Sequence, residues 1–128
     1  MQTFANTTDG IKRIWKIERL WEIASSLPVK DVMLAGISNL DEVSWFGDTP
    51  DESPTCRRVA DHAKRIYEAD FDHPVILSSE GWVMDGMHRV CKAYLLGKLY
   101  SLHIILNPMR LLAEIKRQRQ YWMKFAIE

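Results

Sequence analysis

Residues 82–97, WVMDGMHRVCKAYLLG, form the stretch that decides the fold of this chain. The first three residues are apolar and suit a short strand, and Asp85 and Gly86 then mark a turn. The next residues suit a helix that begins at about Met87. It ends at Gly97, a residue type that favours the left-handed conformation at which many helices stop. The stretch therefore predicts a strand, a sharp turn and a helix in direct succession.

The first turn of this predicted helix carries two cationic side chains, His88 and Arg89. Cations at a helix N-terminus oppose the macrodipole, whereas the unpaired N–H groups there favour an anion. A phosphate or carboxylate bound at residues 85–89 would explain this placement, and Gly86 would let the backbone approach it closely. In the alternative interpretation, His88 and Arg89 are surface residues that pair with Asp70, Asp72 or Glu80.

Other polar residues near this turn have several candidate roles. Asp85 is a candidate general base, a candidate Mg²⁺ ligand and a candidate N-cap of the helix. His73, which precedes Pro74, is a further candidate ligand-binding residue. The four histidines, at positions 62, 73, 88 and 103, lack the close spacing of a zinc site, so we expect no metal centre built on them.

Composition places the chain among soluble single-domain proteins. It has 128 residues, of which 47% are hydrophobic and 27% charged. Lys plus Arg and Asp plus Glu both total 17, so the basic surplus typical of nucleic-acid-binding proteins is absent. No apolar run reaches a membrane-spanning length, and we expect a cytoplasmic protein. The two cysteines form no CxxC motif, which argues against a disulfide framework.

Hydrophobic periodicity predicts the remaining elements. Upstream, it predicts a helix over about 10–27, extended pieces through Val32–Ile37 and Val43–Phe46, and a loop over 47–54. A helix capped by Thr55 and running to about Ala69 follows, with an apolar face formed by Val59, Ala63, Ile66 and Tyr67. A hairpin over 75–84 precedes the helix that begins at Met87, and a strand over 99–106 and a basic helix over about 108–124 follow it.

The N-terminal helix carries two of the five tryptophans, Trp15 and Trp21. Its apolar stripe predicts packing on the core of the domain. The alternative is that Trp15 and Trp21 pack on a second subunit, which would make the protein a homodimer through its Trp-rich helices.

Residues 73–98, HPVILSSEGWVMDGMHRVCKAYLLGK, resemble the N-terminal domain of the ParB family and its relatives, the sulfiredoxins and the free serine kinases. The matching residues are Pro74, Val75, Ile76 and Leu77 in the strand, Asp85, Gly86, His88 and Arg89 in the turn, and Ala93, Leu96 and Gly97 in the helix. The resemblance covers about residues 55–106 and is looser over 29–46. It implies one ParB/sulfiredoxin-like α+β domain over 1–128, with a small mixed sheet, a core at about 29–106 and extra helices over about 10–27 and 108–124.

The resemblance also implies a ligand. In these families the turn binds nucleotide phosphates, so ATP, ADP or CTP, with Mg²⁺, would be held by Gly86, Met87, His88 and Arg89, with His73 nearby. Sulfiredoxins carry a catalytic cysteine where this chain has Met87, and a thioether cannot replace a thiolate. Only 22 residues follow Leu106, too few for the helix-turn-helix domain of ParB, so sequence-specific DNA binding is not expected.

The closest local motif is the Asp-Gly-x-His-Arg box of the free serine kinases. These enzymes use an acidic residue from the early strand region as a base, for which Asp41 and Glu42 are the candidates here. We therefore expect a nucleotide-binding protein that acts as a phosphotransferase or nucleotide hydrolase. The alternative is a non-catalytic module that binds a partner protein or nucleic acid.

Overall fold

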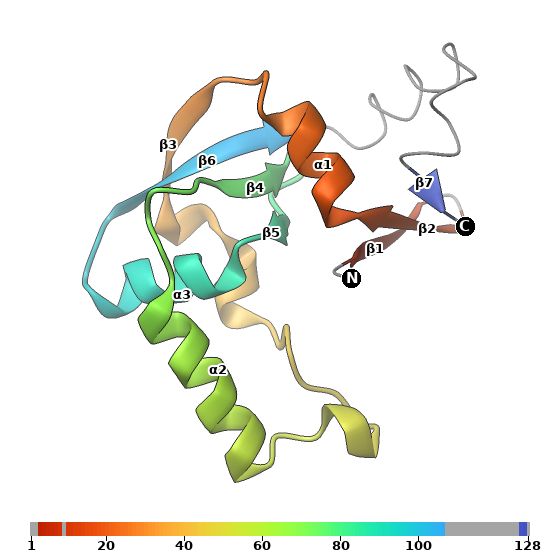
Figure 1. Cartoon of the computed structure of the whole chain (residues 1–128), viewed down its shortest axis with the longest axis vertical. Coiled ribbons are helices and arrows are strands. Elements are labelled where there is room, and N and C mark those ends of the chain that lie inside the picture. Colours follow the sequence, from red (N-terminus) through yellow and green to blue (C-terminus); the bar gives the residue numbers. More distant parts are fainter. Residues whose placement is uncertain (1–2, 9, 107–125, 128) are drawn as a thin grey trace.

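The computed structural model describes residues 3–8, 10–106 and 126–127 of the chain. They form an α+β domain, which confirms the predicted class (Figure 1). The helices are α1 (Ile17–Ala24), α2 (Cys56–Glu68) and α3 (Met87–Leu95), and 3-10 turns cover Leu34–Gly36, Ser38–Asp41 and Pro50–Glu52. The strands are β1 (Thr3–Thr8), β2 (Ile11–Lys16), β3 (Val29–Met33), β4 (Val75–Ser78), β5 (Val83–Asp85), β6 (Tyr100–Leu106) and β7 (Ala126–Ile127).

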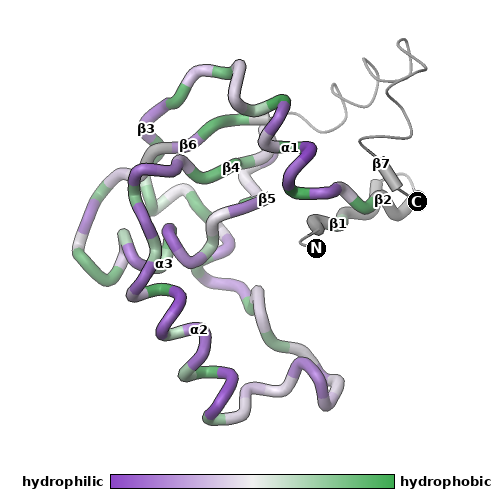
Figure 2. Tube along the Cα trace, viewed as in Figure 1, coloured by the Kyte–Doolittle hydropathy of each residue, from purple (hydrophilic) through white to green (hydrophobic). Residues whose placement is uncertain are grey.

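The larger of the two described sheets has four strands in the order β3-β6-β4-β5. β6 runs parallel to β4 and antiparallel to β3, while β5 forms an antiparallel hairpin with β4. All four residues of β4 are buried, as expected for an inner strand covered on both faces. Figure 2 shows the hydrophobic residues of β4 and β6 at the centre of this sheet. The sheet is thus mixed, as the resemblance implied.

The core has two parts, one on each face of the larger sheet. Val75 and Ile76 are neighbours on β4 and therefore point to opposite faces. The Ile76 side is covered by α1 and the end of β2, and its buried residues are Trp15, Ile17, Leu20, Ala24, Ile76, Met84 and Ile104. The Val75 side is covered by α3 and a 3-10 turn, and its buried residues are Leu34, Ile37, Val75, Val90 and Ala93.

The predicted helix over about residues 10–27 is wrong in its first half. Ile11–Lys16 is β2, which pairs antiparallel with β1 and with β7, and only Ile17–Ala24 is helical. A short apolar stretch with β-branched residues suits either structure, and the pairing with β1 decides in favour of a strand. Trp15 is consequently fully buried on β2, so it does not lie on a helix surface that could pack on a second subunit.

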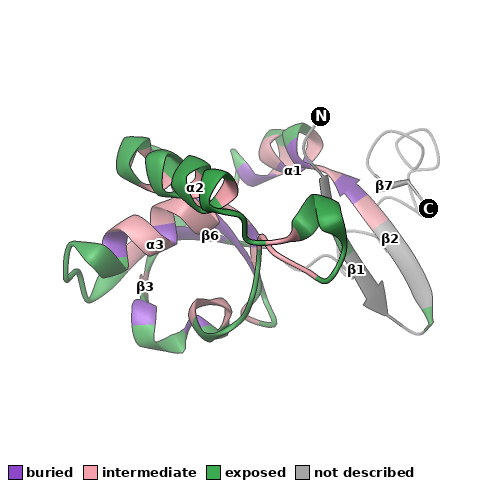
Figure 3. Ribbon diagram, turned by 90° about the horizontal axis from the view of Figure 1, so that it is seen from below, coloured by how far each residue is buried: buried purple, intermediate pink, exposed green. Residues whose placement is uncertain are grey.

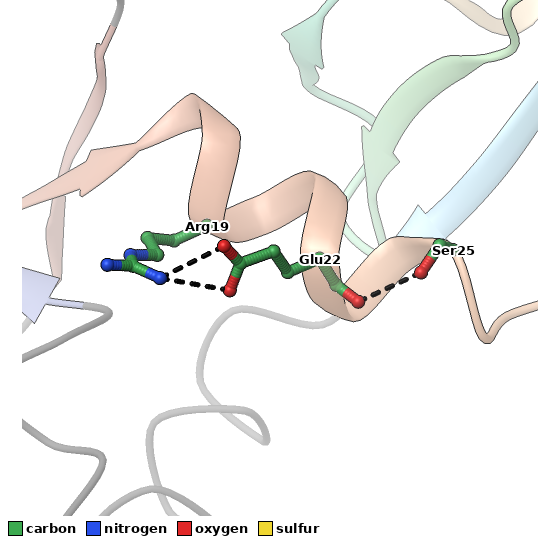
Figure 4. A network of polar contacts seen from close by, with 3 residues as sticks. All are labelled: Arg19, Glu22 and Ser25. Atoms are coloured by element: carbon green, nitrogen blue, oxygen red, sulfur yellow. Dashed lines mark hydrogen bonds and ion pairs between the residues drawn. The ribbon is translucent and has the colours of Figure 1, made fainter.

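The outer side of α1 is polar (Figure 4). Arg19 Nη1 lies 2.9 and 3.1 Å from the two carboxylate oxygens of Glu22, and Ser25 Oγ donates to the Glu22 carbonyl at 2.9 Å. An exposed ion pair of this kind contributes at most about 1 kcal/mol. Burial of Leu20 and Ala24 against the sheet therefore holds α1 in place.

The predicted hairpin over 75–84 and the predicted helix that begins at Met87 are confirmed. β4 and β5 lie on either side of a turn in which the Gly81 N–H donates to the Ser78 carbonyl at 2.9 Å. α3 ends in a Schellman motif: Gly97 has φ +72°, and the Gly97 and Lys98 N–H groups donate to the carbonyls of Tyr94 and Ala93, each at 3.0 Å. The stop at Gly97 thus has the predicted geometry.

Helix α2 is capped by Thr55, whose Oγ1 accepts from the Arg58 N–H at 3.3 Å, as predicted. The apolar face predicted for this helix does not enter the core, because no residue of α2 is buried and Tyr67 is 81% exposed. Figure 3 shows α2 in the colours of exposed and intermediate residues. Polar contacts attach the helix instead. Lys92 Nζ, from α3, donates at 2.8 Å to the carbonyls of both Tyr67 and Ala69 at the end of α2.

The remaining predictions are confirmed in part. The extended piece predicted through Val32–Ile37 is a strand only as far as Met33, because a 3-10 turn begins at Leu34, and Val43–Phe46 forms no strand. The strand over 99–106 is present as β6. The helix predicted over 108–124 lies outside the described residues. Within the described residues, no helix has the length and apolar character needed to cross a membrane.

Candidate functional site

Helix α3 has an unusual N-terminus. Gly86 is the N-cap, with φ +105° and ψ 25°, and no side chain caps the helix. The first helical hydrogen bond runs from the Val90 N–H to the Gly86 carbonyl at 3.1 Å, so the N–H groups of the first turn have no acceptor within the helix. The cap role considered for Asp85 is therefore wrong. Its Oδ2 instead accepts from Trp21 Nε1 at 2.7 Å, which joins β5 to α1.

Glycine is required at position 86 for two reasons. A positive φ is strained for residues with a Cβ atom. In addition, a Cβ at this position would lie 2.9 Å from Arg89 Nη1 and 3.0 Å from Val75 Cγ2. The turn is thus packed tightly on its inner side.

A cavity of about 410 Å³ opens beside this turn. Residues from α1, α2, β5, α3 and the segment between β3 and α2 line it: Ile17, Asn39, Ser44, Trp45, His62, Arg65, Val83, Met84, Asp85, Gly86, Met87 and His88. Four of the residues singled out in the sequence, Asp85, Gly86, Met87 and His88, therefore share one cavity. Its volume falls in the range of small-molecule sites.

A pair of histidines forms one side of this cavity. His62 Nδ1 on α2 and His88 Nε2 on α3 are 2.9 Å apart, which is a hydrogen-bond distance. The Trp45 ring stacks on both imidazoles, at centroid distances of 4.5 Å to His62 and 4.3 Å to His88, with 9° between the planes in each case. The rings of Phe46 and His62 pack edge to face, with their centroids 5.4 Å apart. The aromatic contacts hold the two imidazoles in fixed relative positions.

Both histidines favour the neutral form. Burial, with contributions from His62, Arg65 and Arg89, lowers the pKa of His88 to about 4, against the opposing effect of Asp85. Burial and then Arg65 lower the pKa of His62, and Asp61 opposes them. At neutral pH the cavity therefore contains a neutral imidazole pair beside the guanidinium of Arg65.

Arg89 and His73 lie along a different cavity, of about 130 Å³, on the Val75 side of the sheet. Arg89 Nη1 donates to the Pro74 carbonyl at 2.9 Å and so ties the start of β4 to α3. Successive residues on a helix point about 100° apart, which is why His88 and Arg89 face different spaces. The structure thus separates two residues that the sequence suggested would share one phosphate.

The two acidic candidates from the early strand region also lie apart from the histidines. Asp41 lines a third cavity, of about 340 Å³, and Glu42 is exposed to solvent. The same segment contributes Asn39 and Ser44 to the histidine cavity. Asn39 Oδ1 accepts from the Val83 N–H at 3.0 Å, which fixes the wall of the cavity next to β5.

Sequence reasoning did not assign His62, Arg65 or Trp45 to this site, although all three line the cavity. His62 and Arg65 are three apart on α2 and therefore lie on one face of it, a signal that the sequence does contain. Trp45 lies in an irregular segment, and nothing in the pattern around it indicates a stack on two histidines.

The cavity residues do not form a resident metal site. Asp85 is its one carboxylate, and one of its oxygens accepts from Trp21. No group of three or more His, Cys, Asp or Glu side chains that could hold a metal ion occurs within 3–8, 10–106 and 126–127.

Comparisons with protein-family models, with curated proteins and with solved structures find no match to this chain.

Proposed function

We propose that this chain is a nucleotide-binding domain of ParB/sulfiredoxin-like fold, whose ligand phosphates occupy the cavity at the N-terminus of α3. The observation that carries the proposal is that one cavity is lined by the uncapped N-terminus of α3, with His88 in its first turn, and by Arg65 of α2. Helix N-termini and guanidinium groups are the donors that proteins use to bind phosphate. The donors thus support a phosphate-containing ligand.

The order of elements supports the fold. A buried strand, a hairpin partner, a glycine turn, a helix and a parallel return strand follow one another as β4, β5, α3 and β6. This is the order that the resemblance over residues 55–106 implies. The N-terminal strands β1 and β2 and their pairing with β7 lie outside that region.

The size and lining of the cavity favour a nucleotide over inorganic phosphate. A volume of about 410 Å³ exceeds the space that one phosphate needs. Apolar residues such as Ile17, Val83 and Met84 line the cavity together with the polar groups, which suits a ligand with an uncharged body and a charged end. ATP, ADP and CTP are therefore the ligands to test, with Mg²⁺ carried by their phosphates.

Calorimetric titration of the full chain with ATP, ADP, CTP and GTP, with and without Mg²⁺, tests the proposal. At least one nucleotide should bind, and Arg65→Ala should weaken it about tenfold or more, because a hydrogen bond to a charged group contributes about 1.5–3 kcal/mol. Arg57→Ala is the matched control, since Arg57 is an exposed arginine of α2 that does not line the cavity. No binding at millimolar nucleotide, or equal affinity of Arg65→Ala and wild type, would overturn the proposal.

A second function, a non-catalytic module that binds a partner protein, is favoured by exposed apolar residues near the end of α3. Leu95 is 70% exposed and Leu99 75%, and Met33, Tyr94, Leu96 and Tyr100 are exposed as well. Exposed apolar groups of this extent mark many interaction sites. Light scattering tests for self-association, and a DNA-binding assay at low salt tests the nucleic-acid alternative. A strict monomer without DNA affinity would count against the module.

A further inference from the structure

The contact between His62 and His88 determines how the pair carries protons. A neutral imidazole has one N–H and one bare nitrogen. A hydrogen bond between His62 Nδ1 and His88 Nε2, 2.9 Å apart, needs one proton between them. Two neutral rings carry two protons, so one proton lies in the shared bond and the other lies on an outer nitrogen. The outer nitrogens are His62 Nε2 and His88 Nδ1.

The neutral pair therefore always has one donor end and one acceptor end. If His62 Nδ1 holds the shared proton, His62 Nε2 is bare and His88 Nδ1 carries a proton. If His88 Nε2 holds it, these roles are reversed. Uptake of a proton at the bare end, transfer of the shared proton and release at the far end convert one state into the other. The pair can thus act as a base and an acid in the same step.

The residues around the two imidazoles keep the pair neutral and hydrogen-bonded. A second proton in the shared contact would place two N–H groups against each other, and the neighbouring Arg65 and Arg89 oppose added positive charge. Asp61 raises the pKa of His62 and Asp85 raises the pKa of His88, both against the net downward shift. The stacked Trp45 ring restrains both imidazoles from turning out of contact. Both rings line the cavity in which the phosphate is proposed to bind.

We propose that His62 and His88 form the acid–base pair of a hydrolase that cleaves a phosphate ester or phosphoanhydride bound in this cavity. The inference rests on the proposed function and adds the reaction to it. Water is the second reactant. Its oxygen forms a bond to phosphorus and its proton passes to the bare outer nitrogen. The bond from phosphorus to the leaving oxygen breaks, and that oxygen takes the proton of the other outer nitrogen.

Proton balance is complete in this step, because one proton enters the pair and one leaves it while the shared proton moves across. The pair finishes in its other tautomer and returns by proton exchange with solvent. Arg65 and the N-terminus of α3 stabilise the charge on phosphorus-bound oxygens. His62 and His88 are catalytic residues in this scheme, and Trp45 is a positioning residue.

The test measures binding and turnover separately on the full chain, by calorimetry and by phosphate release from ATP, ADP and CTP with Mg²⁺. His62→Asn and His88→Gln each place an amide near the inner nitrogen and remove the outer one. Each should lower kcat about 100-fold or more, the usual contribution of general acid–base catalysis, while nucleotide binding stays measurable through Arg65 and the N-terminus of α3. The double variant should lose no more than either single variant, because the two residues act as one unit.

Tyr67→Gln is the matched control, since it changes an exposed ring of the same helix and should leave both quantities unchanged. Nucleotide binding without any phosphate release by the wild type would overturn the hydrolase and leave the binding proposal intact. Phosphate release that survives in either histidine variant would also overturn the relay. Absence of binding, in contrast, would overturn the proposed function itself.

Discussion

Replacement of Gly86 by alanine tests whether the turn into α3 is as tightly constrained as its geometry indicates. The positive φ of +105° costs an alanine about 1–2 kcal/mol. The new Cβ would also lie 3.0 Å from Val75 Cγ2 and 3.3 Å from Val75 Cα, and Val75 is buried, so crowding adds about 1–3 kcal/mol. We therefore expect Gly86→Ala to lower the free energy of unfolding by about 2–5 kcal/mol, the sum of these two contributions.

Gly97→Ala is the matched control for this experiment. Gly97 has φ +72°, but a Cβ there would have nothing within 4 Å, so only the conformational cost of about 1–2 kcal/mol applies. Urea unfolding followed by tryptophan fluorescence gives both values by linear extrapolation. Equal destabilisation of the two variants, within about 0.5 kcal/mol, would refute the crowding argument.

Part of the destabilisation expected for Gly86→Ala comes from the guanidinium of Arg89 and can be measured separately. An alanine Cβ at position 86 would displace Arg89 Nη1, 2.9 Å away, from its hydrogen bond to the Pro74 carbonyl. Arg89→Ala alone should cost about 1.5–3 kcal/mol through the loss of this bond. In the Gly86→Ala background it should cost less, because the bond is already weakened, and a double-mutant cycle measures the difference. Strict additivity would contradict this coupling.

Three further predictions concern other parts of the domain. Trp21→Phe removes the donor to Asp85 and should cost about 1.5–3 kcal/mol in urea unfolding, whereas an unchanged midpoint would contradict the importance of that bond. Lys92→Met removes both donors to the α2 carbonyls and should raise amide hydrogen exchange in α2 but not in β4; equal exchange in wild type and variant would contradict this attachment of α2. Burial lowers the pKa of His103 from 6.5 to about 4. Between these pH values the unfolded chain binds a proton at this histidine that the folded chain does not bind. The free energy of unfolding should therefore fall as the pH drops from 6.5 to 4, by up to about 1.4 kcal/mol per pH unit. His88 acts in the same direction, and His103→Leu should reduce the slope measured by urea unfolding at pH 5 and pH 7; an undiminished slope would exclude His103 as its source.

Local sequence signals predicted the part of the fold around residues 75–106 well. Apolar strands, a turn with Gly86 and a stop at Gly97 are each encoded within a few residues, and the structure has all of them. The segment at 11–16 was mispredicted because its apolar residues suit a helix and a strand alike. Pairing with β1 decides between them, and that pairing is a tertiary contact.

Of the candidate site, the sequence predicted only the residues of the turn that leads into α3. Asp85, Gly86, Met87 and His88 line one cavity because they are neighbours in sequence at the edge of one strand. The contact of His88 with His62 joins residues 26 apart on two helices, and nothing local encodes how α2 packs on α3. The helical rotation between His88 and Arg89 is readable from sequence, and it indicates that one cavity would not receive both side chains.

Imidazole ¹⁵N spectra of the full chain, titrated with pH in the absence and presence of saturating ATP, ADP or CTP, test the central claim most directly. A phosphate beside the pair should shift the signals of His62 and His88 and raise the pKa of His88 above its free value of about 4. The signals of His103, which is buried away from this cavity, should stay unchanged. Nucleotide binding that leaves His62 and His88 unchanged, or that shifts His103 instead, would contradict a phosphate site at the N-terminus of α3.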